Sequence, residues 1–430
     1  MKIIDKGKQY VMNTYGRYEL ALDHGDGCYV WDVDGKKYLD FGAGIAVNAL
    51  GHNHARLAEA IARQAGEMLH VSNLYWTKQQ VELAERLITH SPFDKVFFCN
   101  SGAEAVEGSL KLARQYAYKK HLQDKDIHHD KCDAIPEIIS MAHSFHGRTF
   151  GALSVTGQTK YQKGFAPLLP GVKFAEYNDF DSLLGQVTDN TCAIILEPIQ
   201  GEGGIHPASA QYLQNVRALC NERDIVLIFD EVQCGVGRTG KFFAFDNLAP
   251  TPGTDGNSDS AEASLAPGSD TTCGVVPDVA CLAKGLAGGV PIGAVLARGK
   301  FADALQPGEH ASTFGGNPLA TTAAAVVLDE LFNNELLEHV TKVGKYLSQS
   351  LTSLKNNGAV NTYTVLDVRG VGLLQGIELN QPASEIVNRC MAAGLLLVPA
   401  GANVIRFAPP LIVTEQQIDE AIGILQKALE

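Results

Sequence analysis

The stretch Ile225-Val226-Leu227-Ile228-Phe229-Asp230-Glu231-Val232-Gln233 decides the fold. Its apolar half predicts a buried strand, and Asp230 follows where that strand ends. A second apolar run, 279–282, leads to Lys284 in a glycine-rich segment. In α/β domains, ligands bind outside the carboxyl ends of the strands. We therefore expect Asp230 and Lys284 to lie at the same edge of a mainly parallel sheet.

A carboxylate and an amine at two strand ends are the minimum set of groups for pyridoxal phosphate chemistry. The amine of Lys284 would attach the cofactor covalently, and Asp230 would keep the pyridine nitrogen protonated so that the ring can accept electrons. Each residue alone is ambiguous, because a strand-end aspartate is usually a solvated turn residue and a lone lysine usually lies at the surface. The hypothesis therefore depends on the motifs around the pair.

The composition is typical of an enzyme with more than one domain. The 430 residues are 45% hydrophobic and 19% charged, and the formal net charge is -13. This acidic balance disfavours nucleic acid and anionic membranes as partners, and no apolar run approaches the length of a membrane span. The first residues lack the apolar core of a signal peptide, and the nine cysteines include no C-x-x-C pair. We therefore expect reduced thiols and a cytoplasmic location.

Other apolar runs predict the remaining strands and helices. Strands are expected at 95–99, 138–141, 192–196, 225–229, 279–282 and 294–296, and helices at about 103–118, 319–331 and 336–354. Residues 29–40 form a hairpin pattern around the turn Asp34-Gly35, which we expect outside the main sheet. The alternation predicts an α/β domain, and the pattern after about Thr313 predicts a smaller α+β domain.

Residues 250–275 differ in composition from the rest of the chain. Thr, Pro, Gly, Asp, Ser and Ala dominate them, and no periodicity is present. A segment of this kind cannot bury enough apolar surface to offset the entropy lost on ordering. We expect a solvated, mobile insertion at these positions.

The segment Asn100-Ser101-Gly102-Ala103-Glu104 joins a predicted strand to a predicted helix. Small residues at a helix start let backbone amides approach an anion, and the helix dipole favours the negative charge. This pattern indicates a phosphate site. The other interpretation is an ordinary N-cap at Ser101, and the segment alone does not decide between the two.

A second strand end leads into His143-Ser144-Phe145-His146-Gly147-Arg148-Thr149. Phe145 could stack on a cofactor ring, and Arg148 could bind a carboxylate through two parallel hydrogen bonds. The alternative is a packed phenylalanine and a surface arginine. The paired histidines here and elsewhere have no cysteine or carboxylate at metal-ligand spacing, so we expect loop or surface histidines and no metal site.

The segment Gly235-Val236-Gly237-Arg238-Thr239-Gly240 matches the dinucleotide pattern G-x-G-x-x-G. That fingerprint requires a strand, a turn and a helix together. Residues 241–246 do not open a convincing helix, and the region where a ribose-binding acid is due runs into 250–275. We therefore expect the glycines to shape a bend beside Asp230 and Gln233 rather than to bind a nicotinamide cofactor.

Taken in order, these motifs resemble those of the class III pyridoxal-phosphate aminotransferases. The resemblance runs from Phe41 to Pro410, and its most specific segments are 100–105, 145–149, 197–204, 229–233, 282–285 and 313–318. Several such segments in the family's order are far more specific than any one of them. Residues 250–275 depart from the family pattern as an insertion, and 121–137 is longer than usual, but neither interrupts a motif.

The resemblance implies the type I fold of pyridoxal-phosphate-dependent transferases, an α/β fold. In it, a large, mainly parallel-sheet domain is joined to a smaller α+β domain built from both termini. We expect residues 1–50 to join the small domain, 51–312 to form the large cofactor-binding domain and 313–430 to form the C-terminal small domain. The family also implies a homodimer with shared active sites. Thr313 would reach the phosphate in the neighbouring subunit, and Ser312 would lie beside the substrate.

The same resemblance assigns roles around the cofactor. Lys284 and Asp230 would be catalytic: Lys284 attaches the cofactor and moves the substrate proton, and Asp230 pairs with the pyridinium nitrogen. Gln233 would hydrogen-bond the phenolic oxygen, and Phe145 would stack on one face of the ring. The phosphate contacts would come from the hydroxyl of Ser101 and the backbone amides of Gly102 and Ala103.

Two arginines would let one pocket accept glutamate and a second amino donor in turn. In the family, the position of Arg148 binds the α-carboxylate of an ω-amino donor, and that of Arg406 binds the α-carboxylate of glutamate. Glu202 would pair with Arg406 and mask it when no α-carboxylate is present. Ile45 stands where ornithine aminotransferases carry a tyrosine that contacts the free α-amine, which favours a donor whose α-nitrogen is acylated.

The resemblance thus implies transfer of the ω-amino group of N2-acetylornithine to 2-oxoglutarate, a step of arginine biosynthesis. Succinylornithine, 4-aminobutyrate and ornithine are the alternative donors within the class, and sequence alone does not distinguish an acetyl from a succinyl group. A non-catalytic protein of the same fold would be expected to lose Lys284 or Asp230, and both are present.

Overall fold

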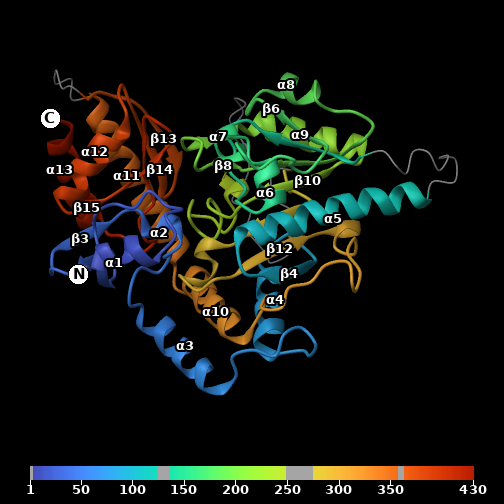
Figure 1. Cartoon of the computed structure of the whole chain (residues 1–430), viewed down its shortest axis with the longest axis horizontal. Coiled ribbons are helices and arrows are strands. Elements are labelled where there is room, and N and C mark those ends of the chain that lie inside the picture. The colour runs from blue at the N-terminus through green and yellow to red at the C-terminus, as the bar shows by residue number, and fades with distance from the viewer. Residues whose placement is uncertain (1–2, 124–134, 248–274, 357–362) are drawn as a thin grey trace, which may run out of the picture.

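The computed structural model describes residues 3–123, 135–247, 275–356 and 363–430. A seven-stranded sheet forms its centre, with the strand order β4-β12-β11-β10-β7-β5-β6 (Figure 1). Its strands are β4 (Lys95–Cys99), β5 (Glu137–Met141), β6 (Val172–Ala175), β7 (Thr191–Leu196), β10 (Val226–Asp230), β11 (Val279–Leu282) and β12 (Gly293–Ala297). Only β12 runs antiparallel to its neighbours, β11 and β4. The predicted, mainly parallel α/β sheet is confirmed.

The strands of this sheet are buried on both faces. Along β10, Leu227 and Phe229 belong to one cluster of buried hydrophobic residues, and Val226 and Ile228 belong to another on the opposite face. Side chains alternate between the faces of a strand, so an uninterrupted apolar run produces this arrangement. The run ends at Asp230, which lies at the carboxyl edge of the sheet.

Helices cover the sheet and extend the large lobe. The longest is α5 (Gly102–Gln123), which packs against β11 and β12. Asn317 caps α10 by accepting a hydrogen bond from the Ala320 amide at 2.9 Å, and Pro318 follows at the first helical position, where no N–H is needed. Helix α10 spans Pro318–Asn333, and the remaining helices of this lobe are α3 (Ala55–Glu67), α4 (Lys78–Thr89), α6 (Phe150–Val155), α7 (Thr159–Gln162), α8 (Phe180–Leu184) and α9 (Ala210–Arg223).

The two ends of the chain meet in a second lobe, where blue and red segments lie together in Figure 1. The hairpin β2 (Tyr29–Asp32) and β3 (Lys37–Asp40) is confirmed, with Gly35 at φ 84° in its turn. Strand β3 pairs in parallel with β15 (Leu395–Leu396), and β1 (Leu22–Asp26) completes that sheet. A further antiparallel sheet contains β13 (Val365–Val371), β14 (Leu374–Leu379), β17 (Val404–Phe407) and β16 (Val398–Ala400).

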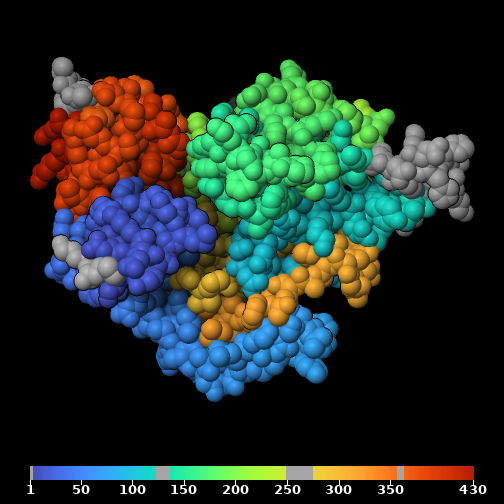
Figure 2. Space-filling view, in the orientation of Figure 1, coloured from blue at the N-terminus to red at the C-terminus, as the bar shows by residue number. Residues whose placement is uncertain are grey.

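The helices of the second lobe are α1 (Ile3–Tyr10), the irregular turn α2 (Ala43–Ala46), α11 (Leu336–Asn356), α12 (Ala383–Ala392) and α13 (Glu415–Leu429). Of these, α11 and α12 pack on the sheets of this lobe, and α13 packs on both α11 and α12. One cluster of buried hydrophobic side chains includes Phe229 of β10, Leu331 of α10, Ile405 of β17 and Leu425 of α13. Figure 2 shows the surface hollowed between the two lobes. Among the described residues, no helix is both long and apolar enough to cross a bilayer.

The glycine-rich segment after β10 forms a bend, as the sequence predicted. Gly237 and Gly240 have φ of 82° and 88°, and the buried Arg238 between them donates to the backbone oxygens of Leu373 and Pro409. The chain then forms the short 3₁₀ turn η2 (Ala244–Asn247), not the long helix of a dinucleotide fingerprint. The predictions made for 250–274 and for 124–134 fall outside the described residues.

Candidate active site

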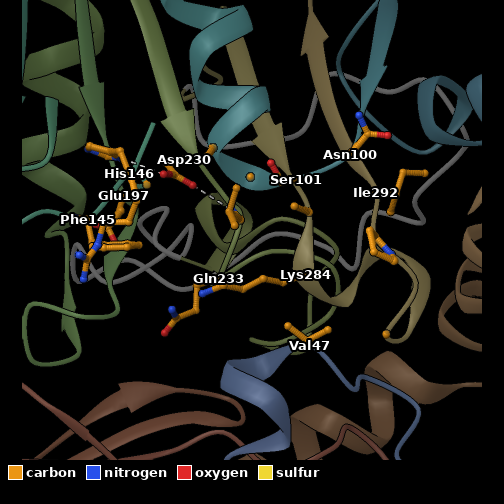
Figure 3. A pocket seen from close by; sticks show the side chains of 18 of the residues that line it. Val47, Asn100, Ser101, Phe145, His146, Glu197, Asp230, Gln233, Lys284 and Ile292 are labelled. Carbon is orange, nitrogen blue, oxygen red and sulfur yellow. Dashed lines mark hydrogen bonds and ion pairs between the residues drawn. The ribbon is translucent and has the colours of Figure 1, made fainter. Parts of the chain in front are cut away.

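A cavity of about 440 Å³ opens at the carboxyl edge of the large sheet (Figure 3). It receives side chains that follow β4, β5, β10 and β11, together with Val47 from the second lobe. Its volume is typical of a small-molecule site. Most of the site residues expected from the sequence line it: Ser101, Gly102, Ala103, Phe145, Arg148, Asp230, Gln233 and Lys284.

Lys284 begins the 3₁₀ turn η3 (Lys284–Ala287) directly after β11. Its φ of 44° lies in the left-handed region, which costs free energy in a residue with a side chain and is most often found at functional sites. Burial and, after it, the nearby charge of Arg406 lower the pKa of the amine to about 8, against the opposing effect of carboxylates such as Glu202. A lysine with such a pKa supplies an appreciable fraction of neutral, nucleophilic amine near pH 7.

Asp230 is held by a buried histidine. Its Oδ2 lies 2.7 Å from Nδ1 of His146, and its Oδ1 accepts a hydrogen bond from the Val232 amide at 3.0 Å. A carboxylate oxygen only accepts, so His146 donates through Nδ1. His146 lies in the loop after β5, as one of the two expected alternatives allows, but its side chain is fully buried and not at the surface.

Glu197 is a second buried acid that the sequence analysis did not single out. Burial raises its pKa to about 7, and its oxygens accept hydrogen bonds from the amides of Phe145 at 3.0 Å and Gly201 at 3.1 Å. It thereby fixes the backbone on two sides of the cavity. Both His146 and Glu197 lie inside motif segments quoted above, and that position was the available signal.

The start of α5 combines an N-cap with an open anion site. Ser101 Oγ accepts a hydrogen bond from the Glu104 amide at 3.2 Å, so the N-cap interpretation is confirmed. The hydroxyl keeps its own proton to donate, and the first amides of a helix have no intrahelical partner. A Cβ on Gly102 would lie 2.7 Å from Val232 Cγ1, so this close approach requires glycine. The segment can therefore serve both purposes.

Arg148 is positioned by aromatic rings. Its guanidinium carbon lies 3.8 Å from the ring centre of Tyr161 and 5.6 Å from that of Phe145. The Phe145 and Tyr161 rings meet edge to face at 5.9 Å. Stacking uses the flat face of the guanidinium and leaves its edge N–H groups for a carboxylate. The surface interpretation of Arg148 is correct in that its side chain is exposed, but it also lines the cavity.

Arg406 lies behind Gln233 and is almost fully buried, with 1% of its surface exposed. Its Nη1 donates to Glu202 Oε1 at 2.6 Å and to Gln233 Oε1 at 2.8 Å. Its Nη2 is buried without a hydrogen-bond partner among the described residues. The expected pair of Arg406 and Glu202 is thus present, and half of the guanidinium fork remains unsatisfied.

Two predicted residues lie at the edge of the site rather than in it. Ser312 Oγ accepts hydrogen bonds from Asn100 Nδ2 at 3.1 Å and from the Gly315 amide at 3.0 Å, and Asn100 itself lines the cavity. Thr313 is exposed, and its backbone oxygen accepts a hydrogen bond from Ser72 Oγ at 3.1 Å. The structure does not bring Thr313 into the cavity of its own chain.

Similarity to known proteins agrees with this geometry. The profile of the class-III aminotransferases matches residues 10–253 and 268–429. The chain is 46% identical to the acetylornithine aminotransferase of Clostridium acetobutylicum over 424 residues, 98% of this chain and 100% of that protein. It is 48% identical to that of Caldanaerobacter subterraneus over 423 residues, 98% of each chain.

Solved structures lead to the same class. The N-acetylornithine aminotransferase of Stenotrophomonas maltophilia superposes with a TM-score of 0.77 at 33% identity, covering 99% of this chain and 98% of that one. The ornithine aminotransferase of Toxoplasma gondii superposes with a TM-score of 0.86 at 30% identity, covering 99% and 94%. With sequence, fold and cavity in agreement, the chain belongs to the class III aminotransferases.

Proposed function

We propose that this enzyme transfers the ω-amino group of N2-acetylornithine to 2-oxoglutarate. The products are N-acetylglutamate 5-semialdehyde and glutamate, a step of arginine biosynthesis. The observation that carries the proposal is the buried Arg406, paired with Glu202 yet with Nη2 unsatisfied. Glu202 neutralises Arg406 when no substrate carboxylate is present, and the unpaired Nη2 remains available to bind one. This suits a site that must accept an α-carboxylate in one half-reaction and none in the other.

Class III aminotransferases depend on pyridoxal phosphate, and the residues present fit that group. Lys284, whose amine has a lowered pKa, and Asp230 line one cavity. The backbone amides at the start of α5, which have no intrahelical acceptor, lie in the same cavity. When bound, the cofactor supplies an aldehyde that condenses with amines and a ring that accepts electrons. We assign Ser101, Gly102 and Ala103 to its phosphate. Gln233 would hydrogen-bond the phenolic oxygen of the cofactor, and Phe145 would stack on one face of its ring.

The chain's own residues then hold and move protons. Lys284 Nζ would accept and return the proton at the carbon that bears the ω-amino group, and its lowered pKa suits both tasks near neutral pH. Asp230 keeps the ring nitrogen protonated, and His146 holds the Asp230 carboxylate in place through Nδ1.

The donor's acyl group is accommodated by an unusual turn. Ala43, Gly44, Ile45 and Ala46 all have positive φ, between 45° and 64°, and Val47 directly after them lines the cavity. Such a conformation is strained for β-branched Ile45, which a purely structural turn would avoid. The turn presents an exposed apolar side chain and no charge. A neutral N-acyl group needs space rather than a counter-charge, so it suits this position.

We further propose a cytoplasmic homodimer with shared active sites, in which Thr313 contacts the partner's phosphate site and Ser312 lies beside the substrate. An exposed apolar surface supports it: Leu74 is 82%, Tyr75 71%, Trp76 90% and Phe314 60% exposed. Side chains of this size are rarely left open to solvent together in a monomer. Ser72 and Thr313, which are hydrogen-bonded, lie beside this surface. The seven cysteines in the described ranges are buried and unpaired, as in a reducing compartment.

The domain division of 1–50 with 313–430 against 51–312 is part of the same proposal. The parallel pairing of β3 with β15 supports it, because it joins the N-terminal hairpin to the C-terminal part of the chain. Helix α10 falls within 313–430 by sequence but packs mainly on α3 and α4 of the large lobe and also contacts α11, so it joins the two parts.

Replacing Trp76 with aspartate is expected to raise the dimer dissociation constant by about a hundredfold and to lower activity in parallel. A buried interface tryptophan is commonly among the side chains that contribute most to association. Sedimentation velocity over a range of concentrations measures the effect. The matched control is Leu366→Asp on β13, an exposed apolar residue far from this surface. A Trp76→Asp variant that stays dimeric would remove this surface from the proposed interface.

Replacing Arg148 with lysine is expected to raise KM by about tenfold to a hundredfold for both amino donors. Lysine keeps the charge but loses the planar fork and the stacking on Tyr161. Steady-state kinetics with each donor measures the change, and Lys160→Arg beside the same ring serves as the control. An unchanged KM for both donors would show that Arg148 holds no carboxylate.

The proposed reaction is tested most simply by its two halves. N-acetylornithine alone should bleach the aldehyde-form absorbance of the holoenzyme, and 2-oxoglutarate should restore it. No change in absorbance with N-acetylornithine would refute the proposed donor. Ornithine is the second candidate, favoured by the TM-score of 0.86 to an ornithine aminotransferase. Ile45 argues against ornithine as the donor, because ornithine aminotransferases carry at this position a tyrosine that contacts the free α-amine.

A further inference from the structure

The side-chain amide of Gln233 lies between the cavity and the buried pair of Arg406 and Glu202. Gln233 lines the cavity, as Figure 3 shows, and its Oε1 accepts a hydrogen bond from Arg406 Nη1 at 2.8 Å. The same nitrogen donates to Glu202 at 2.6 Å. Burial works to raise the pKa of Glu202, but Arg406 and a side-chain hydrogen bond to Gln233 lower it. The amide therefore contacts both members of the ion pair.

Gly201 makes this placement of Gln233 sterically feasible. A Cβ at position 201 would lie 2.3 Å from Gln233 Oε1 and 2.6 Å from its Cδ. The amide thus rests directly on the glycine backbone, which Glu197 fixes from the other side through the Gly201 amide. Any larger residue at position 201 must push the end of Gln233 away from Arg406.

A substrate carboxylate has to compete with Gln233 for Arg406. Carboxylates bind arginine best through two parallel N–H bonds. Nη2 has no partner among the described side chains, but Nη1 is already shared by Glu202 and Gln233. A carboxylate bound to both terminal nitrogens uses one N–H of Nη2 and one of Nη1, so it must displace either Glu202 or Gln233 from Nη1, and removal of one of these acceptors should favour the ligand.

We propose that Gln233 is a specificity-determining residue whose amide oxygen, together with Glu202, closes Arg406 against carboxylates. It withdraws when glutamate or 2-oxoglutarate binds and returns when the N-acyl donor occupies the site. Gln233 thus sets the balance between a substrate that presents a carboxylate to Arg406 and one that does not. This inference rests on the proposed function only in taking Arg406 as the α-carboxylate site.

The test measures binding of glutarate, a five-carbon dicarboxylate without an amine or oxo group, to the holoenzyme by calorimetry. Gln233→Met keeps the volume but removes the oxygen from Arg406, so glutarate should bind about five- to tenfold more tightly. Gln233→Glu places a second carboxylate on Arg406, so glutarate should bind at least about tenfold more weakly. If the substitutions acted only by disturbing the packing, both would change glutarate affinity in the same direction. An increase for one and a decrease for the other therefore indicates a specific effect on Arg406.

A third variant moves Gln233 without changing its chemistry. The backbone at Gly201 is not in the left-handed region, so alanine is tolerated there and its methyl displaces the amide. Gly201→Ala should therefore tighten glutarate binding in the same direction as Gln233→Met. The control is Gln375→Met, a buried glutamine on β14 that is 2% exposed and bonded to the Gly372 carbonyl, and it should leave glutarate affinity unchanged.

Cofactor absorbance gives the loaded fraction of each variant, and affinity is expressed per loaded site. The inference is overturned if glutarate fails to bind the wild-type holoenzyme. It is equally overturned if the dissociation constants of Gln233→Met and Gly201→Ala stay within about twofold of wild type, or rise. If the wild-type enzyme does not react with N-acetylornithine, the proposed donor is wrong. The glutarate measurements would still test the role of Gln233, because they do not depend on the donor.

Discussion

Lys284→Ala is expected to reduce turnover by at least about 10⁴-fold while leaving the fold and the dimer intact. The side chain supplies the amine that attaches the cofactor and the group that moves the substrate proton, and its loss removes both. Alanine is expected to be accepted at this position, because the backbone strain at φ 44° is already present with lysine. Stopped-flow and steady-state assays measure the loss.

The control for Lys284→Ala is Lys95→Ala, which removes an exposed lysine that pairs with Asp303 at the amino-terminal end of β4, away from the carboxyl edge where the cavity opens. Its turnover should match wild type, and both variants should melt cooperatively. A small added amine such as methylamine should restore part of the lost proton transfer in Lys284→Ala alone. Turnover of Lys284→Ala within about tenfold of wild type would contradict its assigned role.

Arg406→Met is expected to slow the glutamate half-reaction by about 10²- to 10³-fold and the N-acetylornithine half-reaction far less. Truncating one partner of a buried, hydrogen-bonded charge pair typically costs about 2–5 kcal/mol, and only glutamate presents an α-carboxylate to this arginine. Single-turnover measurements separate the two half-reactions, which steady-state constants mix. Equal losses in both would remove the basis for distinct roles of Arg148 and Arg406.

The single substitution at Arg406 also leaves the partly buried Glu202, whose side chain is 23% exposed, without its partner. Such an uncompensated charge destabilises a fold by about 3–5 kcal/mol. The double variant Arg406→Met with Glu202→Gln removes that charge and should recover most of the stability. Because the double variant still lacks the guanidinium, its glutamate half-reaction should remain slow. Recovery of the glutamate half-reaction in the double variant would attribute the loss to misfolding instead.

The parts of the fold that depend on local pattern were predictable from sequence. The buried strands β10 and β11, the hairpin β2–β3 and the long helices α10 and α11 all follow from apolar runs, turn residues and helical periodicity. Asp230 and Lys284 could be placed together because parallel strands bring their carboxyl ends to one edge. Sequence pattern thus sufficed for the centre of the site.

The rest of the site depends on geometry that no local pattern encodes. Nothing in the chain predicts the left-handed turn around Ile45, since that conformation is unfavourable for these residues and is maintained only by tertiary contacts. His146 was expected in a loop or at the surface. It lies in the loop after β5, but only the folded sheet, in which β7 joins β5 to β10, brings it to Asp230 in the interior. The contact of Gln233 with Arg406 joins residues 173 positions apart through the second lobe. Long-range contacts of this kind require the folded structure.

The central claim is that the pocket selects an N-acylated ω-amino donor, and a donor panel tests it most directly. Specificity constants, kcat/KM, are measured for N-acetylornithine, N-succinylornithine, ornithine and 4-aminobutyrate with 2-oxoglutarate at a fixed concentration. We predict that N-acetylornithine has the highest value and exceeds ornithine by at least about a hundredfold, a difference of about 2.7 kcal/mol. A specificity constant for ornithine or 4-aminobutyrate equal to or above that for N-acetylornithine would contradict the claim.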